Sequence, residues 1–218
     1  MNDPIKLIKR LYEVDNHRDS KEDNAISVTT LIGDLYKAKL SLRKSPRDQS
    51  LIDFKFKRSS TLGTAFHEYA EKYLRDDNIV QEVYREKQIE ISGIVYTISG
   101  CCDLLQQQDD GTWDIMDWKT FYGRERKSDA LAKDAMQMSL YRWLLQDEYD
   151  INDRGWVLAI SQSNNFQEAY PVNLSDLDTV QDYIDNKIFA IEENDKVDCF
   201  NVKYPPCNYC SFICEHRK

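Results

Sequence analysis

The chain has 218 residues, which is enough for one substantial hydrophobic core, with or without a small appendage. Hydrophobic residues make up 41% of it and charged residues 31%, and no apolar run approaches the roughly 20 residues of a membrane-spanning helix, so a membrane protein is not expected. The net charge of −9 argues against nucleic-acid binding spread over the whole surface, but it allows binding along one basic channel.

The N-terminal region, residues 1–26, is polar and charged, and a short helix is expected at Ile5–Val14. The chain opens with Met1-Asn2-Asp3-Pro4 rather than with an apolar signal segment, so we expect no export and a cytoplasmic location. In that reducing compartment the six cysteines are interpreted as thiols or metal ligands rather than as disulfides.

Two helices are expected next. The hydroxyls of Ser27–Thr30 suit the N-cap of a helix that continues through Tyr36 and breaks by Ser45-Pro46. Between Thr61 and about Asp76, apolar residues recur at three- and four-residue steps, which predicts a second helix. Its apolar stripe consists of Leu62, Phe66, Tyr69 and Tyr73. A neighbouring line on the same helix carries Gly63, His67 and Glu71.

Three strands are predicted between residues 81 and 119. Val83–Ile91 is followed by a strand that begins at Ile94 and runs to Leu105, and Ser92-Gly93 supplies the hairpin turn between them. Asp109-Asp110-Gly111 is a strong turn signal, and the apolar strand Thr112–Lys119 follows it.

The second half continues with a long helix at Ser128–Glu148, a strand pair at Trp156–Ser161 and Phe166–Val172, and a final acidic helix at Leu174–Asn194. No internal repeat or flexible linker divides the chain. We therefore expect one domain at residues 1–200 and a cysteine-rich, metal-binding tail at residues 201–218.

The central chemical signal is Asp103 followed by Asp117-Trp118-Lys119. Asp117 and Lys119 are two residues apart on a strand and share one face, and the intervening hairpin would bring Asp103 close to Asp117. Two carboxylates and an amine suit phosphodiester hydrolysis, because carboxylates bind Mg²⁺ and an ammonium ion stabilises developing negative charge.

An Asp-x-Lys pair on a strand is more often only a solvated, salt-bridged face. Here Ile115, Met116 and Trp118 make the strand largely apolar, so it should lie inside the sheet. Charges are costly there without a function, which favours the catalytic interpretation.

Four short motifs occur in a fixed order: Gly63-x-x-x-His67, Asp103, Asp117-x-Lys119 and Gln137-x-x-x-Tyr141. Together they resemble the RecB-like branch of the PD-(D/E)XK nucleases, which includes bacterial recombination exonucleases and CRISPR-associated adaptation nucleases. The resemblance spans residues 60–145, and the C-terminal cysteines extend it. It implies an α/β fold with a restriction-endonuclease-like core: a central mixed β-sheet flanked by helices, with a small cysteine-rich C-terminal appendage.

The resemblance also implies roles for single residues. Residues His67, Asp103 and Asp117 and the backbone carbonyl of Trp118 would bind Mg²⁺ or Mn²⁺, and the imidazole suits manganese. Lys119 would be the catalytic lysine. Glu86 stands where relatives frequently carry a glutamate on the first strand, and we count it as a supporting catalytic residue. For His67 the alternative is a partly buried helix histidine without a ligand.

DNA contacts are expected beside this centre. The resemblance assigns Gln137 and Tyr141, which share a helix face, to the rim of the site and to DNA contact. The preceding loop, Gly123–Lys127, is basic, and it could hold the DNA backbone while an aromatic residue stacks on a base. Its candidate DNA-binding residues are Tyr122, Arg124, Arg126 and Lys127. A solvated charged loop is an equally good interpretation.

The tail carries Cys207, Cys210 and Cys214, with His216 after them and Cys199 upstream. In RecB-like relatives such a trio joins a distant N-terminal cysteine around a four-iron cluster, but this chain has no cysteine before Cys101. A [4Fe-4S] cluster would need Cys199 or another donor, whereas a Zn²⁺ site could be completed by His216 or Cys199. We rank zinc slightly ahead of iron–sulfur, and an empty remnant is the alternative.

The leading interpretation is a metal-dependent DNA nuclease, preferably an exonuclease, that acts in recombination, repair or replication of a cellular or mobile-element genome. One alternative is a non-catalytic subunit that binds DNA or protein in a helicase or recombinase complex, although the intact Asp103, Asp117 and Lys119 argue against it. Another is a CRISPR adaptation nuclease, against which the missing N-terminal cysteine counts. DNA is the expected partner, with a helicase or recombinase as a further one.

Overall fold

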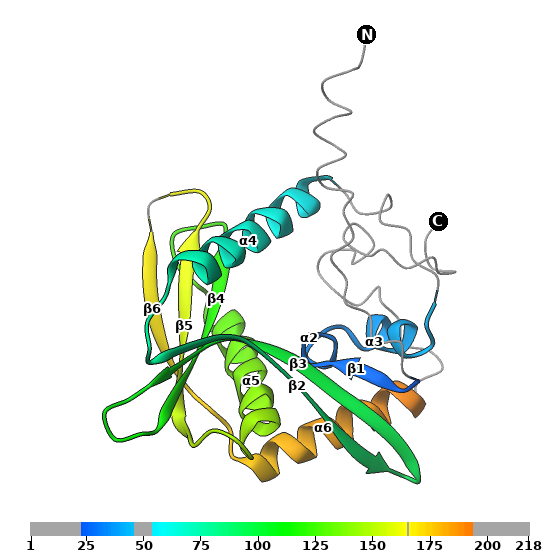
Figure 1. Ribbon diagram of the computed structural model, residues 1–218. Coiled ribbons are helices and arrows are strands. Elements are labelled where there is room, and N and C mark those ends of the chain that lie inside the picture. The colour runs from blue at the N-terminus through cyan, green and yellow to red at the C-terminus, as the bar shows by residue number, and fades with distance from the viewer. Residues whose placement is uncertain (1–22, 46–53, 165, 194–218) are drawn as a thin grey trace.

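The structure is a computed structural model that describes residues 23–45, 54–164 and 166–193. Helices flank a mixed six-stranded sheet (Figure 1), which confirms the expected α/β architecture. The strands are β1 (Ala25–Ser27), β2 (Ile79–Ile91), β3 (Ile94–Gln107), β4 (Trp113–Phe121), β5 (Ile151–Ser161) and β6 (Gln167–Asn173). The helices are α2 (Val28–Leu31), α3 (Leu35–Leu42), α4 (Phe54–Tyr73), α5 (Ser128–Leu145) and α6 (Leu177–Glu193). The expected first helix and the cysteine-rich tail lie outside the described residues.

The sheet is organised around β3. Along one edge, β3 pairs with antiparallel β2 over almost its whole length. Along the other edge it pairs first with parallel β1, at Thr97–Ser99, and then with antiparallel β4, at Leu104–Gln107. Within the described part of the chain, residues 100–103 therefore have no strand partner on that edge, and this interval forms the floor of the candidate site.

The predicted turns are found where expected. Ser92 and Gly93, with φ of 54° and 80°, both take the left-handed conformation of a tight hairpin turn between β2 and β3. Gly111, with φ of 89°, occupies the turn before β4. Strand β4 lies between β3 and β5, so the expectation that the Asp-x-Lys strand is interior is confirmed.

The segment after residue 23 differs from the expected single helix. Ser27 does cap a helix, because its Oγ accepts a hydrogen bond from the Thr30 amide at 3.2 Å. However, α2 ends at Leu31, and α3 begins afresh with Asp34 accepting from the Lys37 amide. Strand β1 precedes α2 and was not predicted, because three residues carry no readable periodicity and their partner on β3 is remote in sequence.

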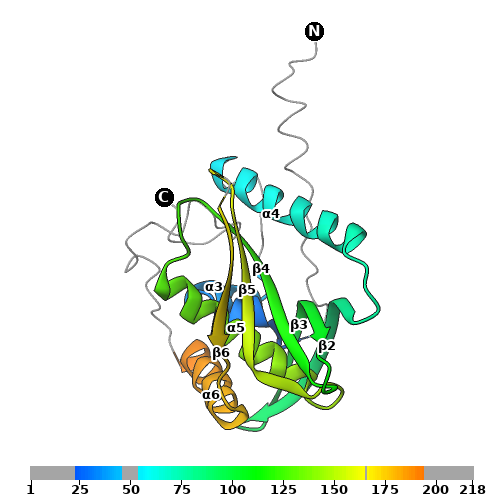
Figure 2. The ribbon, with the colours of Figure 1, turned by 90° about the vertical axis from the view of Figure 1, so that its left-hand side faces the viewer.

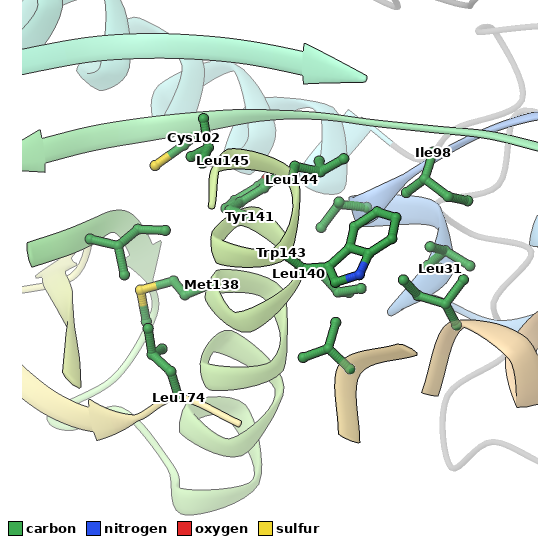
Figure 3. Packing of buried hydrophobic residues seen from close by; sticks show 14 of the residues in the cluster. Leu31, Ile98, Cys102, Met138, Leu140, Tyr141, Trp143, Leu144, Leu145 and Leu174 are labelled. Atoms are coloured by element: carbon green, nitrogen blue, oxygen red, sulfur yellow. The ribbon is translucent and has the colours of Figure 1, made fainter. Parts of the chain in front are cut away.

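The core lies between the sheet and α5, and α6 packs against α5 at the lower side of Figure 1. Figure 3 shows α5 directing Met138, Leu140, Tyr141, Leu144 and Leu145 into this core. Helix α6 adds Val180, Ile184, Ile188 and Ile191, which are at most 1% exposed. Burying side chains of this size stabilises the fold by about 1.5–3 kcal/mol each. None of the described helices is long and apolar enough to cross a membrane.

Helix α4 is the exception to this close packing. It crosses above the ends of β4 and β5 (Figures 1 and 2) and starts at Phe54, seven residues before the predicted start. Of its apolar stripe, Phe66 packs against the ring of Trp118 in the sheet, whereas Tyr69 and Tyr73 are 62% and 60% exposed. The helix is therefore fastened to the sheet near Phe66.

Candidate active site

The unpaired interval of β3 brings the first two carboxylates together. The β3–β4 ladder ends at the pair Leu104–Met116, so Asp103 and Asp117 are the next residues on their strands. In place of another ladder bond, Oδ2 of Asp103 accepts a hydrogen bond from the amide of Trp118 at 2.9 Å. Asp103 and Asp117 therefore lie close together, as predicted. The side chain of Asp103 continues the pairing of β3 with β4 where the backbone ladder ends.

His67 reaches this point because of how α4 is fastened. The rings of Phe66 and Trp118 meet edge to face at 5.2 Å, which holds this turn of α4 over β4. Gly63 faces the same strand, since a Cβ there would lie 3.1 Å from Oγ1 of Thr120. The next residue after Phe66 is His67, and its Nδ1 lies 3.6 Å from Oδ1 of Asp103.

A glutamate joins His67 and Asp103, and it is Glu82 rather than the expected Glu86. Ligand atoms of His67, Glu82 and Asp103 all lie within 4.8 Å of one another. Glu82 lies between the β2–β3 pairs Gln81–Leu104 and Val83–Cys102, and its φ of 50° interrupts the regular ladder there. Glu86 lies four residues further along β2, where it is exposed and accepts a hydrogen bond from the Tyr84 hydroxyl at 3.0 Å.

Asp117 lies deeper than this group. Its side chain is 1% exposed, and neither carboxylate oxygen accepts a hydrogen bond among the described residues. The Lys119 ammonium group lies beside Oδ2, so the two form an ion pair. A buried carboxylate is costly unless a cation approaches it, and Lys119 is such a cation.

Burial and the neighbouring charge of Asp117 raise the pKa of Asp103 well above its ordinary value. Carboxylates held this close repel one another, and a bound divalent cation would relieve that repulsion. One imidazole and several carboxylate oxygens form a donor set suited to Mg²⁺ or Mn²⁺. The residues present therefore fit a divalent cation at His67, Glu82 and Asp103, beside Asp117.

Lys119 is held from two sides. Burial by itself would lower the pKa of Lys119, but the charges of Asp117 and Asp103 outweigh burial and raise it, so the side chain stays an ammonium ion. Besides the ion pair with Asp117, its Nζ donates a hydrogen bond to Oε1 of Gln137 at 3.0 Å. The amide of Gln137 in turn donates from Nε2 to the hydroxyl of Tyr141 at 2.8 Å.

Gln137 and Tyr141 are only 6% and 4% exposed, so the structure places them beneath Lys119 rather than on an open rim. Burial and the charge of Asp117 raise the pKa of Tyr141 well above its ordinary value, and its hydroxyl stays protonated. Room for the ring comes from Gly100 on β3. A Cβ at Gly100 would lie 2.7 Å from Cε1 of Tyr141 and 3.0 Å from Cδ1 of Leu144.

The basic loop divides into one anchored residue and several exposed ones. Arg126 donates from Nε and Nη2 to the two carboxylate oxygens of Asp134 on α5, each at 2.9 Å, and is 16% exposed. Such a two-bond pair is strong and fixes the loop against the helix. Tyr122 is 51% exposed, and Arg124 and Lys127 are exposed beside it.

All of the central residues line one cleft with a volume of about 1510 Å³, bounded by α4 on one side and by β1, α2 and the end of α3 on another. The cleft is acidic. Its acidic lining residues are Glu68, Glu71, Glu82, Asp103 and Asp117, and its lysines are Lys44 and Lys119. Cys101 also lines it, whereas Cys102 is buried in the core.

Three features of the site were not predicted. Glu82 was missed in favour of Glu86, because only the register of β2 against β3 shows which glutamate faces Asp103. Gly100 and Cys101 lie within the predicted strand from Ile94 to Leu105, where Cys101 and Cys102 are expected to be small core residues; of these two cysteines, Cys102 is buried in the core and Cys101 lines the cleft. Cys101 is two residues from Asp103 on an alternating strand, which was a usable signal that Cys101 also lines the site. No local signal showed that Tyr141 lies against Gly100.

Known proteins resemble this chain in sequence and in fold. Residues 76–214 match the family model of the PD-(D/E)XK nuclease superfamily. The CRISPR-associated exonuclease Cas4 of Saccharolobus solfataricus is 31% identical over 147 residues, which cover 66% of this chain and 69% of that protein. A solved structure, the crystal structure of SSO0001, has the same fold, with a TM-score of 0.61 and 24% identity over 92% of this chain and 89% of that one.

Proposed function

Because the chain belongs to the PD-(D/E)XK nuclease superfamily, we propose that it is a Mg²⁺- or Mn²⁺-dependent DNA exonuclease. The observation that carries the proposal is the meeting of His67, Glu82 and Asp103 beside the buried Asp117 and the charged Lys119 paired with it. The exonuclease activity of the similar Cas4 protein supports attack from a DNA end.

In this proposal, His67, Glu82 and Asp103 hold the cation, with Asp117 and the backbone carbonyl of Trp118 as further donors. When bound, a divalent cation supplies an activated water and neutralises charge on the scissile phosphate. His67 and Asp103 are already oriented by their 3.6 Å contact and by the bond from the Trp118 amide to Asp103. The protein therefore brings most of the donor set to one point before any ligand arrives.

Lys119 positions the reacting oxygens. An ammonium group has three N–H donors, and Asp117 and Gln137 engage two directions. These two contacts fix the orientation of the ammonium group, so its third N–H can donate to a phosphate oxygen or to the attacking water in the cleft. Because Tyr141 accepts from Nε2 of Gln137, the amide presents its oxygen, not its nitrogen, to Lys119.

DNA would be held mainly outside the acidic cleft. The exposed Tyr122, Arg124 and Lys127 lie on the loop after β4 and supply an aromatic ring and two positive charges. Arg126, which is paired with Asp134, positions that loop rather than contacting DNA. Gln137 and Tyr141 are buried, so they support Lys119 from beneath rather than contacting DNA.

The similarity to Cas4 also favours a second candidate, a nuclease of CRISPR adaptation. A recombination or repair exonuclease and a CRISPR adaptation nuclease would use the same active site and would differ in the proteins they work with. Three expectations stay predictions: a cytoplasmic location, a helicase or recombinase partner, and a metal site in the tail. That site would hold Zn²⁺ or [4Fe-4S] at Cys207, Cys210 and Cys214 with Cys199 or His216. These tail residues lie outside the described part of the chain.

The decisive experiment compares wild type with Lys119→Met on end-labelled linear and closed circular DNA, single- and double-stranded. Methionine keeps the length of the stem without the charge, and Lys133→Met, on the exposed side of α5, is the matched control. We expect metal-dependent shortening of linear DNA by wild type and Lys133→Met, and none by Lys119→Met or in chelator. Folded wild-type protein that leaves every substrate intact in both metals would refute the proposal.

A further inference from the structure

One face of α5 carries a buried carboxylate that the proposed nuclease chemistry does not use. Asp134, Gln137 and Tyr141 follow one another at intervals of three and four residues, so they lie side by side on this face. They are 3%, 6% and 4% exposed. Gln137 and Tyr141 support Lys119 from beneath, and Asp134 lies one turn of the helix before them.

The charge of Asp134 is balanced by an arginine. Its two carboxylate oxygens accept hydrogen bonds from Nε and Nη2 of Arg126, each at 2.9 Å, and the arginine side chain is 16% exposed. Both partners therefore lie largely out of water. When one partner of such a buried pair is removed, the charge left behind is strongly destabilising, and it is stabilised by any other cation within reach.

Lys119 is close enough to feel the charge of Asp134. Burial alone would lower the pKa of Lys119, and the charge of Asp134 acts together with those of the active-site aspartates to raise it. Conversely, burial raises the pKa of Asp134, and the charges of Arg126 and Lys119 oppose that rise. Lys119 is also bonded at 3.0 Å to Gln137, which is one turn along α5 from Asp134.

Arg126 belongs to the loop that carries the candidate DNA contacts. The loop is fastened to β5 through the carbonyl of Gly123, which accepts a hydrogen bond from Oγ of Ser161 at 2.8 Å. It is fastened to β6 through the amide of Arg126, which donates to the hydroxyl of Tyr170 at 3.4 Å. The contact with Asp134 therefore links this loop to the helix face that supports the catalytic lysine.

We propose that Asp134 and Arg126 are a positioning pair for Lys119, an inference that rests on the proposed nuclease function. Arg126 neutralises the charge of Asp134. Lys119 therefore stays between Asp117 and Gln137, with its remaining N–H available in the cleft. Without the arginine, Asp134 draws the ammonium group along α5 and away from the reacting oxygens. Both residues thus act on the reaction through Lys119.

Steady-state kinetics on end-labelled DNA tests this pair with Arg126→Gln and with the double variant Arg126→Gln/Asp134→Asn, at a temperature where circular dichroism shows each to be folded. Arg126→Gln leaves Asp134 charged and should lower kcat at least ~10-fold. The double variant removes both charges and should regain most of that loss. A pair that only held the fold together would give a double variant no more active than the single one.

The matched control is Arg142→Gln. Arg142 also lies on α5 and is 19% exposed, but its partner Asp153 is 91% exposed and needs no replacement cation. We expect Arg142→Gln to keep the kcat of wild type.

A second measurement detects the shift of Lys119 without DNA. In chelator, Lys119→Met should lower the melting temperature more in the Arg126→Gln background than in the wild-type background, because two buried carboxylates then lack a cation instead of one. Equal shifts in both backgrounds, or a double variant no more active than Arg126→Gln, would overturn this inference while wild-type cleavage stands. A wild type that cleaves no DNA but shows the larger shift would overturn the proposed function and still support control of Lys119 by this pair.

Discussion

At Asp103, the same burial that prepares the site destabilises the metal-free protein. Below the ordinary carboxyl pKa of about 3.9, the group is protonated whether folded or unfolded and costs nothing. Because its pKa is raised in the fold, a penalty develops as pH rises above that value and is complete above the folded pKa. At neutral pH, which lies above that ordinary value, the buried Asp103 beside Asp117 therefore lowers stability.

Asp103→Asn should remove that penalty while its side-chain oxygen still accepts from the Trp118 amide. In chelator at neutral pH, we expect the free energy of unfolding to rise by about 1–2 kcal/mol in urea denaturation, with the gain vanishing near pH 3. Added Mn²⁺ should stabilise wild type and not the variant. A variant less stable than wild type in chelator would contradict this account.

Tyr141 tests whether the glutamine–tyrosine pair contacts DNA or positions Lys119. Tyr141→Phe removes the acceptor that orients Gln137, and its ring is 4% exposed. We expect kcat to fall roughly 10-fold, equivalent to about 1.4 kcal/mol, with KM for DNA unchanged. Steady-state kinetics on labelled DNA measures both.

The matched comparison is Tyr122→Phe and Tyr122→Ala on the exposed loop, where loss of the ring should raise KM and leave kcat nearly intact. If Tyr141→Phe instead raised KM alone, the tyrosine would be a DNA contact.

At the scale of elements, the site depends on close approaches between helices and strands. Helix α5 meets β3 where Gly100 leaves room for Tyr141, and α4 meets β4 at Gly63, Phe66 and Trp118. The first contact belongs to the core and the second to a helix that touches the sheet over one short stretch. Disturbing them should therefore have different results.

Gly100→Ala should cost about 1–3 kcal/mol in chemical denaturation, because the new methyl group would lie 2.7 Å from the ring of Tyr141, which is only 4% exposed. Among the described residues, Gly63→Ala meets only the Thr120 hydroxyl, at 3.1 Å, and it gains helix propensity of about 1 kcal/mol, so the stability should change little. Its affinity for Mn²⁺ should nevertheless fall, since α4 carries His67. Equal stability losses in the two variants would argue against this difference.

At the scale of the whole molecule, charge makes DNA binding depend on metal. The cleft has five acidic lining residues, and the chain carries a net charge of −9. A phosphate entering it without a cation would meet repulsion from Glu82, Asp103 and Asp117.

With the inactive Lys119→Met variant, fluorescence anisotropy should therefore detect DNA binding in Mn²⁺ or Ca²⁺ and little in chelator. The slope of log affinity against log salt should be shallow, near that of about two or three phosphate contacts, because Arg124 and Lys127 are the exposed basic residues of the loop. A steep slope without metal would indicate a basic channel elsewhere.

The local part of the fold was predictable. Short-range chemistry produced the Ser92-Gly93 hairpin, the turn at Gly111 and the Ser27 cap, each of which depends on neighbouring residues only. Element ends were less accurate, since α4 begins at Phe54 and β2 at Ile79. Burial of α4 was not predictable from its apolar stripe, because Tyr69 and Tyr73 have the right spacing and yet are 62% and 60% exposed.

By itself, the sequence determined the class of fold, the interior position of the Asp117–Lys119 strand and the meeting of Asp103, Asp117 and Lys119, because a two-residue alternation and one hairpin suffice to define them. Only the tertiary structure decided that Glu82 rather than Glu86 joins His67, that Gln137 and Tyr141 lie beneath Lys119, and that Arg126 pairs with Asp134. Those outcomes depend on strand register and on the docking of α4 and α5, which are set by contacts between residues far apart in the chain.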